Sequence, residues 1–181
     1  GHAAVMSGAR VRKRPDGSRL WYRAGQLLLI LGVVAAVSWW RSAPLAHGDA
    51  PALNGQLLLT GESFDLAGLR GQPALVHFWA TWCPVCGLGN RTIDAIAEDY
   101  RVITVAMQSG SPAEIVRYMK NEGLSFPAIP DPHGELASRW GVRGVPTSFV
   151  VDGDGRIRFA TVGYTTGIGL RGRLWTARHL D

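Results

Sequence analysis

The sequence predicts an α/β domain, with a mixed central sheet flanked by helices, preceded by one N-terminal transmembrane helix. Three observations lead to this fold class. Apolar runs of strand length alternate with helical patterns between residues 74 and 122. Two further strand-like runs then surround a glycine-rich turn at 152–155, and a last helical pattern follows them. Near the N-terminus, a run of 17 residues carries no charge.

The positive charge of the chain belongs to its N-terminal end. The net charge is +5 at pH 7, and residues 1–23 alone hold six Lys or Arg against one Asp. The remaining residues hold 13 basic and 13 acidic side chains, so the rest of the protein is neutral. A neutral domain offers no extended basic face for phosphate groups, and we expect no nucleic-acid partner. Residues 1–23 also lack an apolar period, which predicts a disordered basic arm in the cytoplasm.

The uncharged run Ala24–Trp40 is predicted to be a transmembrane anchor. As a helix it would span roughly 26 Å, close to the hydrocarbon core of about 30 Å. The basic arm before it predicts an N-terminus in the cytoplasm and a single pass through the inner membrane, with the later residues on the periplasmic side. A cleaved signal peptide is the alternative, with Leu27–Val37 as its apolar core and small residues at Ala46 and Gly48. Either interpretation exports the domain to a compartment that permits disulfides.

Residues 41–52 are rich in proline and glycine and are predicted to be a linker, so the folded domain is expected over 53–181. Residues 125–133 contain three prolines and are predicted to be a rigid connection without regular structure. A short apolar element is expected over 64–69. We expect strands at 56–59, 74–80, 102–107, 147–151 and 156–162, and helices at 84–100, 112–122, 135–140 and 169–179.

The only two cysteines, Cys83 and Cys86, stand where the strand over 74–80 meets the next helix. If Cys83 is the N-cap, Pro84 takes the first helical position, which proline favours. Cys86 then lies on the same face, within reach of a short disulfide. Cys83 faces the positive end of the helix dipole, which favours its thiolate.

Three roles are possible for this cysteine pair. A structural disulfide would close a very small loop and would constrain the unfolded chain little. A metal site lacks two nearby ligands, because His77 lies six residues earlier on a strand. For a redox pair, the strand, the helix start and the proline all lie where that role requires them, and we therefore favour this role. The only expected cofactor is then the redox-active disulfide Cys83–Cys86 itself, with no metal.

Three segments carry a family resemblance: H-F-W-A-T-W-C-P-V-C over 77–86, G-V-P-T over 144–147 and F-V-V-D-G-D-G over 149–155. Together they resemble thioredoxin-fold proteins, and within these the membrane-tethered periplasmic branch of the TlpA, ResA and DsbE type. The resemblance is greatest to the copper-sensitivity suppressor D type. It implies a protein disulfide oxidoreductase, with exported client proteins in cytochrome c maturation or copper-stress repair. A membrane-bound electron donor or acceptor is implied as well.

The resemblance also assigns roles to residues. Cys83 would attack a client disulfide and Cys86 would resolve the mixed disulfide. Pro146 would lie in cis against the cysteines, while Val145 and Thr147 would hold the client strand. The surroundings of the cysteines would be formed by His77, Trp82, Pro84 and Val85.

His77 stands where thioredoxins carry a buried aspartate that accepts a proton from the second thiol. Gly89 stands where some reductive relatives carry a glutamate, so both acidic positions of the family are vacant. His77 is either a hydrogen-bonded core histidine or a substitute proton relay to Cys86.

We expect the protein to work as a reductant. Two alternatives remain open from the sequence: an exported copper-binding protein that uses both thiolates, and a tethered interaction module without catalysis. A thiol peroxidase is disfavoured because its Thr-x-x-Cys arrangement is missing.

Overall fold

The computed structural model describes residues 17–42 and 45–179, which divide into two compact units at residues 39 and 40. The described part of the first unit is helical and belongs to α1 (Gly17–Ser42), a helix that begins before the predicted anchor and ends after it. Large apolar side chains along it are exposed, among them Leu28 at 70% and Leu31 at 63%. Within the described part of the chain, no helix combines the length and the apolar character that crossing a membrane requires. Residues 1–16 of the predicted arm lie outside the described residues. Residues 17–23, which were also expected to be disordered, form the start of α1.

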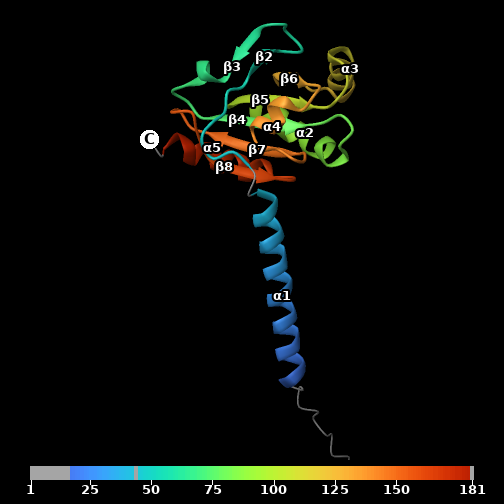
Figure 1. Cartoon of the computed structure of the whole chain (residues 1–181), viewed down its shortest axis with the longest axis vertical. Helices are drawn as coiled ribbons and strands as arrows, with labels where there is room; N and C mark the ends of the chain where they lie inside the picture. The colour runs from blue at the N-terminus through green and yellow to red at the C-terminus, as the bar shows by residue number, and fades with distance from the viewer. Residues whose placement is uncertain (1–16, 43–44, 180–181) are drawn as a thin grey trace, which may run out of the picture. The chain divides into compact units, whose positions relative to one another are not determined.

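The second unit is built on a six-stranded sheet, in the order β1-β8-β7-β4-β5-β6. The central strands β4, β5 and β6 are parallel, whereas β7 runs antiparallel to β4, β8 antiparallel to β7, and β1 antiparallel to β8. The sheet is therefore mixed, as predicted, and β8, β7, β4, β5 and β6 can be followed in this order in Figure 1. Their bounds are β1 Gly48–Asp49, β4 Ala74–Trp79, β5 Arg101–Met107, β6 Ala128–Asp131, β7 Thr147–Val151 and β8 Arg156–Val162.

Both faces of the sheet are covered. Every residue of β4 is buried, because side chains on one face join the core under α2, α3 and α5, and those on the other face join a second core around Trp140. This burial explains the continuous apolar run from which the strand was predicted. The remaining elements are β2 Asn54–Gln56, β3 Ser63–Asp65, the 3-10 helix η1 Leu66–Leu69, α2 Pro84–Ala97, α3 Pro112–Glu122, α4 Glu135–Arg139 and α5 Gly167–Arg178.

The rigid connection predicted over 125–133 contains a strand that the sequence analysis missed, β6. This strand pairs with β5 at one edge of the sheet, with Pro130 opposite Ala106. An edge strand has one side without ladder hydrogen bonds, so it can hold a proline that would disrupt a central strand. The three prolines therefore did not exclude a strand in this segment.

The predicted linker over 41–52 also takes part in the folded unit. Leu45 is buried in the core, the Ala46 amide donates to the Trp140 carbonyl at 3.0 Å, and β1 adds a short strand at the other sheet edge. The folded unit thus includes residues before the expected boundary at 53. A strand of two residues, Gly48 and Asp49, is too short to leave a pattern in the sequence.

Candidate active site

Cys83 is the N-cap of α2, as the sequence predicted, and Pro84 occupies the first helical turn. The Cys86 amide donates a hydrogen bond to the Cys83 sulfur, with 3.2 Å between the two atoms. A helix N-terminus with an N–H directed at the sulfur stabilises a thiolate there. Cys83 is mostly buried and keeps 7% of its surface exposed.

Cys86 lies one turn further along α2 and is completely buried. The structure shows both cysteines as free thiols. Burial, together with the hydrogen bond to Cys83, raises the pKa of the Cys86 thiol to about 12. The two cysteines therefore differ in exposure: Cys83 keeps a small exposed surface, and Cys86 has none.

The loop before β7 meets the cysteines from the other side. The Val145–Pro146 peptide bond is cis, in agreement with the expectation from the resemblance. The Cys83 thiol donates to the Val145 carbonyl at a sulfur-to-oxygen distance of 3.7 Å. Thr147 is buried, and its hydroxyl donates to the Gly144 carbonyl at 2.7 Å. This hydrogen bond stabilises the loop.

Trp82 and Val85 form exposed apolar surface next to Cys83, at 59% and 44% exposure. The Trp82 indole N–H donates to the Gln108 carbonyl at 3.0 Å, and the Thr81 amide donates to the Ser109 hydroxyl at 3.0 Å. The loop after β5 thus positions the segment that leads into the cysteines. Gln108 adopts a left-handed conformation with φ of 47°. The sequence analysis missed this loop, because no pattern links positions 26 residues apart.

His77 is buried on β4, on the face that α2 covers, and its Nδ1 lies 2.9 Å from the Ser148 hydroxyl. Burial lowers the pKa of His77 to about 4, so the imidazole is neutral near pH 7. Burial thus lowers the pKa of His77 and raises that of the Cys86 thiol, and both directions oppose transfer of a proton from Cys86 to His77. This favours the core histidine over the proton relay.

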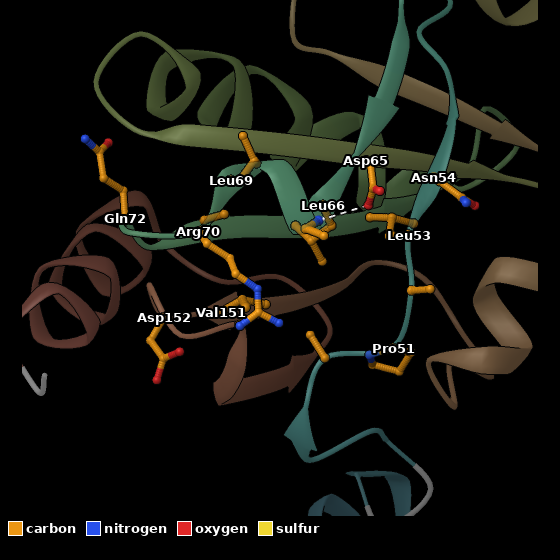
Figure 2. A pocket seen from close by; sticks show the side chains of 15 residues that line it. Pro51, Leu53, Asn54, Asp65, Leu66, Leu69, Arg70, Gln72, Val151 and Asp152 are labelled. Carbon is orange, nitrogen blue, oxygen red and sulfur yellow. Dashed lines mark hydrogen bonds between the residues drawn. The ribbon is translucent and has the colours of Figure 1, made fainter.

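One cavity beside the sheet lies away from the cysteines. It has a volume of about 230 Å³ and lies beside Ala74 and Val151, at the end of β4 opposite Cys83. In Figure 2 the Arg70 side chain extends from η1 toward Val151, and its guanidinium donates to the Asp154 carbonyl at 2.7 Å. None of the predicted site residues lines this cavity.

Metal binding was an alternative for the cysteine pair. Over the described ranges 17–42 and 45–179, no three His, Cys, Asp or Glu side chains gather as a metal site would require. Cys83 and Cys86 could offer two sulfur ligands, which is fewer than the four of a structural zinc site.

Comparisons with known proteins agree with this geometry. The model of the AhpC/TSA family matches residues 47–160. A thioredoxin-like protein from Haemophilus influenzae is 36% identical over 121 residues, which cover 66% of this chain and 72% of that protein. The thiol:disulfide interchange protein DsbE from Escherichia coli K12 is 30% identical over 154 residues, which cover 75% of this chain and 82% of that protein.

A solved structure shares the fold. The crystal structure of a thiol:disulfide interchange protein of the thioredoxin family, from Chlorobium tepidum, aligns with a TM-score of 0.64 and 25% identity. The alignment covers 74% of this chain and 97% of that one. The part of the chain that carries the sheet and the cysteines therefore has a thioredoxin-like fold.

Proposed function

This chain belongs to the AhpC/TSA family of thioredoxin-like proteins, and on this premise we propose that it is a membrane-tethered thiol–disulfide oxidoreductase that reduces exported client proteins. The observation that carries the proposal is the position of Cys83. Its sulfur caps α2, accepts the Cys86 N–H and lies against the Val145 carbonyl of the cis-proline loop. One sulfur is thus prepared to react, and a second is buried directly behind it.

The proposed reaction has two steps. The Cys83 thiolate attacks one sulfur of a client disulfide, so that a Cys83–client disulfide forms and the other client sulfur leaves with the electron pair. Cys86 then attacks the Cys83 sulfur, which breaks the bond to the client and forms Cys83–Cys86. The client gains two electrons and two protons, and the protein becomes oxidised. A membrane-bound thiol–disulfide electron donor would return it to the dithiol.

The surface around Cys83 suits an extended client segment. The Val145 carbonyl lies beside the sulfur, and Trp82 and Val85, near Cys83 in the sequence, present exposed apolar side chains. Backbone pairing at Val145 would align the client, with Thr147 and Pro146 holding the loop in place. We place these clients in cytochrome c maturation or in copper-stress repair, by the resemblance described above.

We infer the reducing direction from the family resemblance. We therefore expect a potential near or below about −250 mV, typical of thioredoxin-like reductants. A potential above about −150 mV would make the protein an oxidant.

Membrane attachment is part of the proposal. It is supported by the uncharged sequence of residues 24–40, by exposed apolar side chains such as Leu28 and Leu31, and by the basic residues that precede them. The N-terminus would lie in the cytoplasm and the cysteines in the periplasm. The test is extraction of membranes with alkaline carbonate, comparing the full chain with a chain lacking residues 1–40. Release of the full chain would contradict the anchor.

The redox role is tested by replacing each cysteine alone. Cys83→Ser should abolish reduction of a protein disulfide, whereas Cys86→Ser should accumulate a mixed disulfide that a gel without reductant detects. The double variant is the control for disulfides formed elsewhere. If both single variants keep the wild-type exchange rate, the redox proposal is wrong.

A further inference from the structure

A small cavity lies directly behind the resolving cysteine. Its walls include Cys86 of α2, His77 of β4, Ser148 of β7 and Thr165 of the loop after β8. The space open to the centre of a water molecule is about 10 Å³. This is close to the volume that one ordered water needs.

Two polar atoms from the walls of this cavity are unpaired. His77 Nε2 and Thr165 Oγ1 are inaccessible to solvent, and neither has a hydrogen-bond partner among the residues that the structure describes. Buried polar atoms in folded proteins nearly always have a partner, either a protein group or an ordered water. The other imidazole nitrogen, Nδ1, is already engaged with Ser148. A single water in the cavity could satisfy both unpaired atoms.

Tyr164 forms one wall of the cavity. Its ring passes over α2 at Gly89, where two ring carbons lie 3.6 and 3.7 Å from the position that a Cβ would take. Gly89 also lines the cavity. A water inside would therefore lie beside the Tyr164 ring, next to α2.

The reaction creates a need for such a water. Cys86 must become a thiolate when it resolves the mixed disulfide, yet its sulfur is fully buried. An isolated buried charge is costly unless hydrogen bonds stabilise it. The walls of the cavity carry no Lys or Arg, and His77 is too weak a base to hold the proton of Cys86.

We propose that this cavity binds one water molecule, positioned by His77 Nε2 and Thr165 Oγ1, which donates a hydrogen bond to the Cys86 thiolate during resolution. The inference rests on the proposed function. Cys86 attacks Cys83, the bond from Cys83 to the client breaks, and the client sulfur leaves with the electron pair and takes up the proton that Cys86 has released to solvent. His77 stays neutral throughout. His77 and Thr165 are positioning residues, because they act through the water.

The test measures the reaction rates of Cys83 and Cys86 separately. The reduced full-length protein reacts with an aromatic disulfide, dithiobis(nitrobenzoate), which releases one coloured thiolate when Cys83 attacks and a second when Cys86 resolves. Thr165→Val keeps the shape of the side chain and removes its hydroxyl, while Thr165→Ser keeps the hydroxyl. We expect Thr165→Val to slow the second release by about tenfold or more, as for the loss of one hydrogen bond to a charged group. The first release should not change, and Thr165→Ser should restore the second.

Two results would overturn the water site. One is a second release at the wild-type rate in Thr165→Val. The other is an equal slowing in both variants, which would assign the effect to packing and not to the hydroxyl. A wild-type protein that releases only the first thiolate would instead contradict the proposed function.

Discussion

His77 and Ser148 face each other across the antiparallel strands β4 and β7, with 2.9 Å between Nδ1 and the hydroxyl oxygen. This pairing holds the imidazole on the α2 side of the sheet, behind Cys86. It gives a polar side chain in the core one partner, while burial lowers its pKa to about 4.

The lowered pKa makes stability depend on pH. His77 is neutral in the folded protein and would titrate at about 6.5 in the unfolded chain, so protonation favours unfolding. The stabilisation is fully present above about pH 6.5 and is lost as the pH falls toward 4, by about 3 kcal/mol in total. This loss can be measured as the fall in the free energy of unfolding, obtained from urea unfolding at pH 7, 5.5 and 4. Each unit by which the pKa is shifted corresponds to about 1.4 kcal/mol.

The control for this prediction is His77→Gln, which cannot titrate in that range. Its free energy of unfolding should fall much less between pH 6.5 and 4. An equal fall in the variant and the wild type would show that other groups cause the pH dependence.

The buried indole of Trp79 depends on one acceptor. Its N–H donates to the Thr104 hydroxyl at 3.0 Å, and both residues are completely buried. Thr104→Val keeps the shape and leaves the indole N–H unpaired, which should lower the free energy of unfolding by about 1–3 kcal/mol. Thr104→Ser retains the acceptor and should cost less. Denaturant unfolding distinguishes them, and a Val variant as stable as the wild type would contradict this role of the hydrogen bond.

Two glycines should respond in opposite directions to alanine. Gly172 lies within α5 with no atom within 4 Å of an added Cβ, so Gly172→Ala should stabilise the protein by about 0.5–1 kcal/mol. At Gly153 a Cβ would lie 3.1 Å from the Gly71 backbone carbon, and Gly153→Ala should destabilise by about 1–3 kcal/mol. Thermal unfolding measures both. Equal melting temperatures would contradict the packing described around these two positions.

Trp82 should matter for client proteins more than for small disulfides. Trp82→Phe loses the hydrogen bond to Gln108 and part of the apolar surface beside Cys83, so we expect KM for a protein disulfide to rise about tenfold. Trp175→Phe is the matched control, since Trp175 is also 59% exposed but lies near the end of α5. The two variants are compared by steady-state kinetics, with a protein disulfide and with a small aromatic disulfide as substrates. An equal effect of both variants would remove Trp82 from the client surface.

Features decided by residues close together in the chain could be predicted from the sequence. Cys83, Pro84 and Cys86 form a helix start through the local preferences of an N-cap and the first helical turn, and the structure has it at those positions. The strand over β4 was predicted for a similar reason, because burial on both faces requires an unbroken apolar run.

Only the tertiary structure decided which distant residues meet. The contact of Cys83 with Val145, the pairing of His77 with Ser148 and the cavity that Thr165 shares with Cys86 join positions 62 to 79 residues apart. Strand register and packing set these contacts, and neither acts through local preference. The edge strands β1 and β6 escaped prediction for the same reason: the neighbouring strand stabilises them, and their own residues show little strand pattern.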